Sequence, residues 1–386
     1  MSKGPLVGVR IIEIASIGPG PFAAMMLADA GAEIIRVDRP QPSSWGGLDP
    51  RVDLLNRGRR SIALDLKAPG AYEVVLRLIE GADALIEGFR PGVAERLGIG
   101  PEICLKRNPR LVYGRMTGYG QDGPLANSAG HDIDYIALAG ALYPIGRAGE
   151  VPVPPLNLVA DFGGGGMLMA FGIATALLSV ARTGEGQVVD AAMVDGVALL
   201  TTMLHGLLAG GMWREERGSN LLDTGAPFYE VYETKDGQFV AVGALEPQFY
   251  RELLSVVGLS EEELPPQEDA DSWPRVKQIL AEVFKTKSRD EWCSLSMDRD
   301  ACIAPVLSPL EAPRHSHNQA RGSYVEKDGL TQPAPAPRFS RTPSALGLPP
   351  PVPGEHTEEI LLEAGYSHSE IEELISKGVA SLPVVS

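Results

Sequence analysis

The sequence predicts an α/β protein, with a large domain built on a Rossmann-like, doubly wound and mostly parallel sheet and a smaller α+β domain. Two patterns lead to this prediction. In the first third of the chain, strand-like runs alternate with helical runs. Much later, FYEVYETKDGQFVAVGA has two β-rich runs around Lys235-Asp236-Gly237, which is a hairpin pattern. A chain of 386 residues is long enough for two such domains, each with its own core.

The alternation in the first third sets the order of elements. The expected strands are 9–14, 33–37, 61–66, 84–89 and 111–117, and the expected helices include 22–30 and 72–79. Strands joined through helices run parallel and are covered by those helices on both faces. Phosphate-bearing ligands usually meet such a sheet at the carboxyl ends of its strands.

The rest of the chain completes the predicted domains. Two stretches rich in Ala, Gly, Leu and Met, 162–182 and 188–212, predict buried helices, and helices are also expected at 248–257, 273–284, 355–364 and 367–377. A proline-rich tract at 333–353 predicts a stiff, extended connector. We therefore expect a large domain at 1–186, a helical connector at 187–224, a small domain at 225–328, and a return linker with C-terminal helices at 329–386.

Composition excludes several classes of protein. The formal charge of −16 argues against a surface for nucleic acid or anionic membrane spread over the whole molecule, so an anionic ligand needs a local basic patch. Cys104, Cys293 and Cys302 lack metal-ligand or C-x-x-C spacing, which indicates reduced thiols in a cytoplasmic protein. The first residues do not have signal-peptide architecture, and we expect no segment with the roughly 18 apolar residues of a membrane span.

One motif has the form of a dinucleotide-binding fingerprint. IGPGPFAAMML contains Gly18-x-Gly20-x-x-Ala23 between an expected strand and an expected helix, so an NAD-dependent dehydrogenase is an alternative. Pro19 and Pro21, however, remove two backbone N–H groups from the turn that would hold the pyrophosphate. A tight turn between strand and helix is the simpler interpretation of this segment alone.

Cations gather at the expected strand ends despite the acidic background. Because the ends of parallel strands converge on one edge of a sheet, these side chains together predict a pocket for a ligand with several phosphates. For any one of them taken alone, a solvated surface charge is the simpler interpretation. The candidates are Arg39, Arg59, Arg60, Lys67, Arg90 and Arg96.

Three stretches carry unusual acid and base content. Asp161, in LNLVADFGGGG, precedes four glycines and a helical run, so it could cap a helix or move a proton beside free backbone amides. Glu246, in VGALEPQFY, stands between a strand and a helix. His131, in GHDIDYIALAG, is either a hydrogen-bonded loop residue or a base. No second histidine stands at metal-ligand spacing from His131, and no metal site is predicted.

Several motifs in order resemble a known family. GPGPFAAMMLADAGAEIIRVDRP, NRGRRSIALDLK, EGFRPGVAERLGIG, RMTGYGQDGP, GHDIDYIALAG, PPLNLVADFGGGG, GQVVDAAMVDG and VGALEPQFY resemble the α-methylacyl-CoA racemases of the family III CoA-transferase (CaiB/BaiF-like) superfamily. The resemblance implies an isomerase that interconverts the (R) and (S) epimers of 2-methyl-branched acyl-CoA thioesters. It also implies an interlocked homodimer, with coenzyme A as part of the substrate and no separate cofactor or metal.

The resemblance implies roles for individual residues. His131, paired with Glu246 of the partner chain, would be one base and Asp161 the other, with the Asp161 backbone N–H stabilising the enolate oxygen. The positions that match coenzyme A contacts are Arg39, Lys67, Arg90, Arg96 and Tyr135. Two rivals stay open: a CoA-transferase in which Asp161 attacks the thioester carbonyl, and a silent acyl-CoA-binding protein. No nucleic-acid or membrane partner is expected.

Overall fold

A computed structural model describes residues 3–40 and 48–383. The chain forms two compact units. The first, called here the sheet unit, comprises Met1–Ala139, Leu156–Leu200 and Arg321–Ser386, and the second, the small unit, comprises Gly140–Pro155 and Thr201–Ala320. This division differs from the expected domains, because residues 140–155 belong to the small unit and residues 187–200 belong to the sheet unit.

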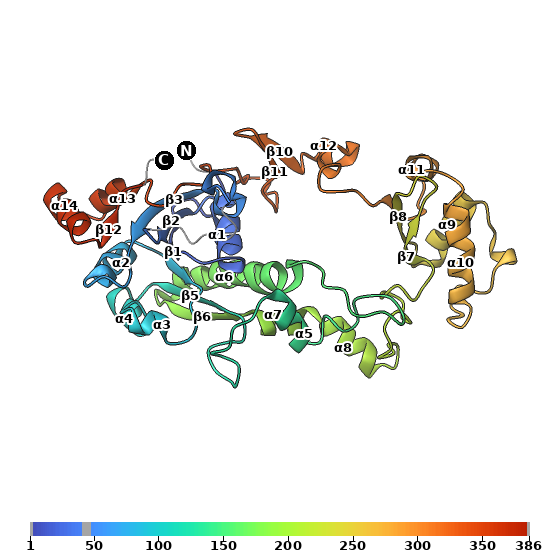
Figure 1. Cartoon of the computed structure of the whole chain (residues 1–386), viewed down its shortest axis with the longest axis horizontal. Helices are drawn as coiled ribbons and strands as arrows, with labels where there is room; N and C mark the ends of the chain where they lie inside the picture. The colour runs from blue at the N-terminus through green and yellow to red at the C-terminus, as the bar shows by residue number, and fades with distance from the viewer. Residues whose placement is uncertain (1–2, 41–47, 384–386) are drawn as a thin grey trace. The chain divides into compact units, whose positions relative to one another are not determined.

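The sheet unit is built on a seven-stranded sheet with the order β12-β3-β2-β1-β4-β5-β6 (Figure 1). Every pairing is parallel except that of β12 with β3. The predicted doubly wound, mostly parallel sheet is therefore confirmed. Its strands are β1 (Arg10–Ile14), β2 (Glu33–Asp38), β3 (Arg59–Leu64), β4 (Ala84–Glu87), β5 (Val112–Thr117), β6 (Gln187–Ala192) and β12 (Ala380–Ser381).

Helices pack on the sheet because both faces of its strands are apolar, as the buried consecutive pairs Ile11-Ile12 and Ile34-Ile35 show. Ile12 and Ile35, for example, are buried in one core with Val75 of α2 and Leu361 of α13. Helices α1 and α6 contact each other and the strands as well. The helices of this unit are α1 (Pro19–Asp29), α2 (Ala71–Glu80), α3 (Val93–Arg96), α4 (Pro101–Arg107), α5 (Asp132–Leu138), α6 (Leu168–Thr183), α7 (Met193–Leu200), α13 (Thr357–Glu363) and α14 (His368–Ser376).

The stretch expected as one long helix at 188–212 is wrong in its first part. Residues 187–192 form β6, which pairs with β5 in parallel register, and α7 follows directly. The β-branched pair Val188-Val189 favours a strand, and pairing with β5 decides between two patterns that local sequence leaves close. The predicted connector at 187–224 therefore begins inside the sheet.

Residues 158–167 form a π-helix, η3 (Leu158–Met167), that leads into α6. Glycines allow η3 to pack closely against α7. A Cβ added at Gly196 of α7 would lie 1.9 Å from the carbonyl oxygen of Gly164 in η3. The joined run Leu158–Thr183 is long and apolar enough to cross a membrane by length and composition, with 44% of its most apolar window buried in the protein. Our expectation that no segment would reach this length is wrong, although α6 packs on β5 and β6 as a core helix does.

A buried ion cluster lies within the sheet. The Glu13 carboxylate accepts hydrogen bonds from Arg36 Nη1 at 2.6 Å and Arg59 Nε at 2.9 Å. Glu13 and Arg59 are fully buried, and Arg59 also donates to the Pro21 carbonyl of α1 at 2.5 Å. Burial alone would raise the pKa of Glu13, but the two guanidinium groups hold it below its usual value.

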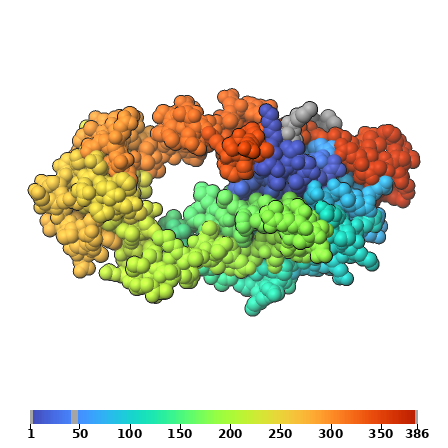
Figure 2. Space-filling view, turned by 180° about the vertical axis from the view of Figure 1, so that it is seen from behind, coloured from blue at the N-terminus to red at the C-terminus, as the bar shows by residue number. Residues whose placement is uncertain are grey.

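The last part of the chain returns to the first. Arg57 pairs with Asp29 and also donates to the Gln332 side chain at 3.0 Å, while the Gly58 N–H donates to the Leu348 carbonyl at 2.8 Å. In Figure 2 the orange return segment lies against the blue N-terminal part. A two-stranded ribbon, β10 (Tyr324–Lys327) and β11 (Leu330–Pro333), belongs to this segment.

The small unit has its own sheet and core. The predicted hairpin forms β7 (Tyr229–Glu233) and β8 (Phe239–Gly243), and β9 (Ile303–Pro305) adds a third antiparallel strand. Its core contains Trp292 and Phe284, whose rings lie edge to face at 5.2 Å. Its helices are α8 (Thr202–Ala209), α9 (Pro247–Val257), α10 (Trp273–Phe284) and α11 (Arg289–Ser296), and α12 (Ser316–Arg321) ends at the boundary with the sheet unit.

Candidate active site

Asp161 lies on the first turn of η3 and is tied to α5 through Asp132. The Asp132 side chain is buried, and its Oδ2 accepts hydrogen bonds from the backbone N–H groups of Ala160 at 2.7 Å and Asp161 at 2.8 Å. Amides at the start of a helix lack partners within that helix, so this carboxylate satisfies two of them. Asp132 therefore fixes the backbone from which the Asp161 side chain projects.

The environment of the Asp161 carboxyl favours its protonated form. Burial raises its pKa above the usual value, and the negative charge of Asp132 acts in the same direction. Asn157 opposes this shift by donating from Nδ2 to Asp161 Oδ2 at 3.1 Å, and so does the nearby His131. A half-buried carboxyl with a raised pKa is suited to give and take a proton.

His131 is the residue before α5, and its side chain is near Asp161. Its backbone N–H donates to Asp134 Oδ2 at 2.9 Å, which fixes the entry into the helix, and its imidazole is exposed. His131 is also close enough to lower the pKa of Asp161. The structure thus brings together two of the three predicted catalytic residues within the sheet unit.

Tyr135 anchors the loop that precedes His131. Its hydroxyl donates to the Gly130 carbonyl at 2.5 Å, and its ring meets Tyr119 edge to face at 5.0 Å. Burial raises the pKa of Tyr135 to about 12, with contributions from Tyr119 and Asp161, while the positive charge of Arg90 opposes the shift. Tyr135 is therefore close enough to both Asp161 and Arg90 for their charges to act on it.

Four predicted cations follow the strands β2, β3 and β4 at the carboxyl edge of the sheet. Arg39 follows β2, Lys67 follows β3, Arg90 follows β4, and Arg96 lies on α3 just beyond Arg90. All four side chains are exposed and, within residues 3–40 and 48–383, have no ion pair or side-chain hydrogen bond. Cations left unpaired at one sheet edge are what a polyphosphate ligand requires.

The loop that carries Arg90 is fixed by the side chain of Glu87, the last residue of β4. The buried carboxylate of Glu87 accepts a hydrogen bond from the Phe89 backbone N–H at 2.6 Å and pairs with Arg115 Nε at 3.1 Å. Burial raises the pKa of Glu87 to about 7. This arrangement fixes the turn at which β4 ends and presents Arg90 to solvent.

Two of the six cations proposed for that pocket are not available to a ligand. Arg59 is the buried partner of Glu13, and Arg60 forms ion pairs with Glu33 and with Glu359 and Glu363 of α13. Both belong to β3 itself, whereas the unpaired cations stand beyond strand ends or on α3. The prediction of a role in ligand binding for Arg59 and Arg60 is therefore wrong.

Glu246 belongs to the small unit, at the position before α9. Its backbone carbonyl accepts from the Tyr250 N–H at 2.9 Å, but its exposed side chain makes no capping hydrogen bond. The carboxylate is close enough to raise the pKa of Cys302. The side chain is thus not used as a helix cap.

Sequence reasoning missed one residue of the site and misjudged one donor. Asn157 stands four residues before Asp161, the spacing that places two side chains on one helix face, and that spacing could have revealed it. The Asp161 backbone N–H was expected to serve an enolate oxygen, but it donates to Asp132. This N–H can donate to an enolate oxygen only if it shares its hydrogen between that oxygen and the Asp132 carboxylate, or if its hydrogen bond to Asp132 breaks.

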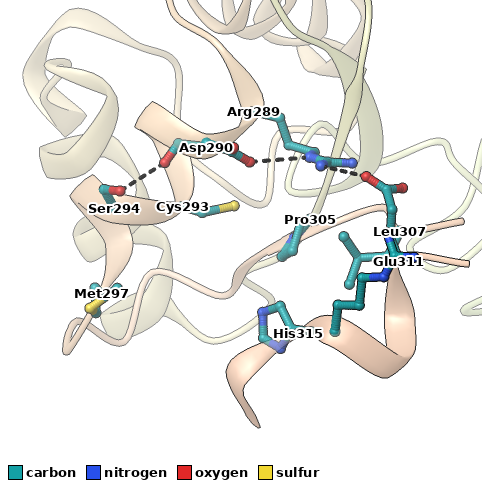
Figure 3. A pocket seen from close by; sticks show the side chains of 10 residues that line it. Arg289, Asp290, Cys293, Ser294, Met297, Pro305, Leu307, Glu311 and His315 are labelled. Carbon is teal, nitrogen blue, oxygen red and sulfur yellow. Dashed lines mark hydrogen bonds and ion pairs between the residues drawn. The ribbon is translucent and has the colours of Figure 1, made fainter. Parts of the chain in front are cut away.

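The small unit also contains an open cavity of about 370 Å³ between α11, β9 and the turn at 312–314 (Figure 3). Arg289 crosses one side of it and pairs with Asp290 and with Glu311. None of the predicted site residues lines this cavity. In the described part of the chain, no group of three or more His, Cys, Asp or Glu side chains is placed to hold a metal ion.

The mostly parallel fold, the unpaired cations at the sheet edge and the nearby Asp161 and His131 agree with the family that the chain matches. Residues 6–357 match CoA-transferase family III, and the chain belongs to this family.

Its similarity to individual members is also extensive. The chain is 49% identical to the α-methylacyl-CoA racemase of Mus musculus over 96% of both chains, and 48% identical to that of Homo sapiens over the same shares. Identity falls to 30% with a succinyl-CoA:glutarate CoA-transferase of Mus musculus, over 98% of this chain and 91% of the relative. A crystal structure of a CAIB/BAIF family protein from Brucella suis superposes with a TM-score of 0.81 at 26% identity, over 94% of this chain and all of that one.

Proposed function

We propose that this protein is an isomerase that interconverts the (R) and (S) epimers of 2-methyl-branched acyl-CoA thioesters by two-base 1,1-proton transfer. The placement of Asp161 and His131 near each other at one end of η3 and α5 is the observation that carries this proposal. The identity of nearly one half to two α-methylacyl-CoA racemases supports it.

The reaction needs a base on one face of the α-carbon and an acid on the other. The α-proton is acidified by the thioester carbonyl, and its removal gives an enolate that is reprotonated from the opposite face. Asp161 has the raised pKa that this alternation of acid and base requires. His131 would serve the other face, with its imidazole as the second base.

We assign the coenzyme A part of the substrate to the unpaired cations at the sheet edge. Arg39, Lys67, Arg90 and Arg96 would pair with its phosphates, and the Tyr135 ring would lie beside the pantetheine arm, because its hydroxyl is already bonded to Gly130. Coenzyme A is then a substrate group and not a resident cofactor.

We further propose that two copies of the chain form the interlocked homodimer implied by the resemblance, with Glu246 of one copy orienting His131 of the other. An apolar, exposed row on the sheet unit supports an interface: Met167, Phe171 and Leu178 are between 53% and 66% exposed. The three free cysteines support a cytoplasmic, reducing location. Light scattering should give twice the chain mass, and a monomer that is fully active would contradict the dimer.

A direct test uses a single epimer of a 2-methylacyl-CoA in D₂O. Deuterium should enter the α-carbon while optical purity falls, and the absence of exchange would contradict the proposal. His131→Ala and Asp161→Asn should each abolish interconversion, since each removes one of two bases.

The same samples should be assayed for CoA transfer to a free carboxylic acid. In a transferase of this family, Asp161 would attack the thioester carbonyl and carry the acyl group as a mixed anhydride while coenzyme A leaves as the thiolate. Transfer without α-proton exchange would replace the racemase proposal with this one.

A further inference from the structure

The Gly-Pro turn with the form of a dinucleotide fingerprint lies against Asp161 in the structure. Gly18 is the residue before α1 and has φ 69° and ψ −113°, the mirror-β region, which glycine adopts and L side chains rarely do. A Cβ added at Gly18 would lie 3.1 Å from Asp161 Oδ2 and 3.5 Å from its Cγ. Any side chain at position 18 would therefore crowd the Asp161 carboxylate.

Two aromatic rings hold the same parts of the chain together. Phe22 of α1 stacks on Phe162 of η3, with ring centroids 4.7 Å apart and planes inclined by 27°. Gly166 makes room for this stack, since a Cβ there would lie 2.6 Å from Phe22 Cδ1. Phe162 directly follows Asp161, so the stack fixes α1 relative to the backbone of the carboxylate.

We propose that Gly18 is a positioning residue for Asp161. The missing side chain leaves the place for the carboxylate beside the N-terminal end of α1, and the Phe22–Phe162 stack sets how closely the two approach. The inference rests on the proposed function, in which Asp161 transfers the proton on one face of the α-carbon. It gives the GPGP segment a role in the isomerase that needs no dinucleotide.

Gly18→Ala should therefore disturb one face of the reaction and not the other. Its methyl group would be closer to Asp161 than ordinary packing allows, so the carboxylate must move by a few tenths of an ångström. A displacement of about 1 Å can slow a reaction on the order of 100-fold, so this smaller shift should slow proton transfer roughly threefold to tenfold. The three atoms nearest to the added methyl group all belong to Asp161, so His131, the residue before α5, should keep its function.

Racemisation rates alone cannot reveal this difference. The equilibrium between epimers is a property of the substrate, so kcat/KM must fall by the same factor in both directions. The informative measurement is solvent exchange without inversion: the α-proton of each pure epimer is followed in D₂O by NMR, with optical purity measured in parallel.

For Gly18→Ala, the expected result is a loss of roughly threefold to tenfold in exchange from one epimer, with exchange from the other epimer retained. Asp161→Asn should affect the same epimer, and His131→Ala the opposite one. Equal losses for both epimers in Gly18→Ala, or no loss, would overturn the role of Gly18. If instead Asp161→Asn keeps exchange from both epimers, the assignment of Asp161 itself fails, which is a separate result.

Gly70→Ala is a matched control. Gly70 also precedes a helix, α2, with a positive φ of 86°, but a Cβ there meets nothing within 4 Å. Gly70 is in the αL region, so Gly70→Ala tests a positive-φ substitution of lower strain in the same unit and should leave both exchange rates unchanged.

A second variant keeps the test decisive if Gly18→Ala does not fold. Phe22→Leu loosens the aromatic stack without any demand on a positive φ. It should lower exchange from the same epimer by a smaller factor, with KM for the acyl-CoA within about twofold of the wild-type value, because Phe22 is assigned no contact with coenzyme A. Unchanged exchange from both epimers would overturn the proposal.

Discussion

Glu13 and Asp161 are two carboxylates of the same unit with opposite surroundings. Glu13 is fully buried between the guanidinium groups of Arg36 and Arg59, and its pKa is lowered despite the burial. Asp161 is half-buried beside another carboxylate, Asp132, and its pKa is raised. Burial acts in the same direction at both sites, so the neighbouring charges determine the outcome.

The two carboxylates therefore serve different purposes: Glu13 stabilises the fold, and Asp161 is suited to proton transfer. A carboxylate with two cationic partners stays ionised and holds strands and α1 together, but it cannot exchange protons near neutral pH. A carboxyl beside a like charge exchanges protons readily, at some expense of stability. The fold keeps the two arrangements apart, one inside the sheet and one at the start of η3.

The largest effect on stability is expected from removing one cation of the buried Glu13 ion cluster. Arg59→Met leaves Glu13 buried with a single cation and should lower the free energy of unfolding by about 3–5 kcal/mol. Because the pKa of Glu13 is lowered in the folded state, its contribution is present above the unfolded pKa and lost as pH falls through the folded one. Urea unfolding measured across pH should thus show a difference between wild type and variant that is largest near neutral pH and shrinks as the pH falls.

Arg60→Gln provides the control for that variant. Arg60 is the next residue of β3, but its partners Glu33, Glu359 and Glu363 are partly exposed. Solvent screens such pairs, so the loss should be about 1 kcal/mol. Equal losses for the two variants would remove the distinction between the buried cluster and the surface pairs.

An intermediate effect is expected from removing the like charge beside Asp161. Asp132→Asn keeps an oxygen that accepts from the Ala160 and Asp161 amides but removes the negative charge that raises the pKa of Asp161. The limb of the kcat/KM–pH profile that reports Asp161 should move to lower pH. Asp134→Asn, at an exposed carboxylate on the same helix, should leave that limb in place, and a shift to higher pH in Asp132→Asn would contradict the comparison.

The smallest effect is expected at Tyr135. Tyr135→Phe removes the hydrogen bond to the Gly130 carbonyl and should lower the free energy of unfolding by about 1 kcal/mol. Because that hydroxyl already has a partner, KM for the acyl-CoA should change by less than about twofold. A large rise in KM with unchanged stability, measured by thermal unfolding and steady-state kinetics, would mean that the hydroxyl contacts the ligand.

Much of the fold could be predicted because local patterns and tertiary packing agree. The strands around Ile12, Ile35 and Leu85 and the helices between them follow their apolar periodicity. The exception is β6, where Val188-Val189 is followed at once by a helix, so no turn signal separates the two. The π-helix at 158–167 has no sequence pattern of its own, and its close contact with α7 is visible only in three dimensions.

The candidate site was predictable as a set of residue types but not as a network. The positions of His131 and Asp161 came from motifs, and the structure adds that Asp132 binds two amides at the start of η3. Arg59 and Arg60 could not be excluded from the ligand pocket by sequence alone. The partner of Arg59, Glu13, is 46 residues away in the chain. Long-range pairing of this kind has no local signal.

The antiparallel pairing of β12 with β3 has a consequence for biosynthesis. Residues 380–381 pair with Leu64 and Ala63 of β3, while His356 and Thr357 already bond to Ser61 and Ala63, so the Leu64 end of this edge stays open until residues 380–381 have been made. An unpaired strand edge invites association with other chains. Chains that end between α13 and β12 would expose this end of β3 and should aggregate more than chains that include β12.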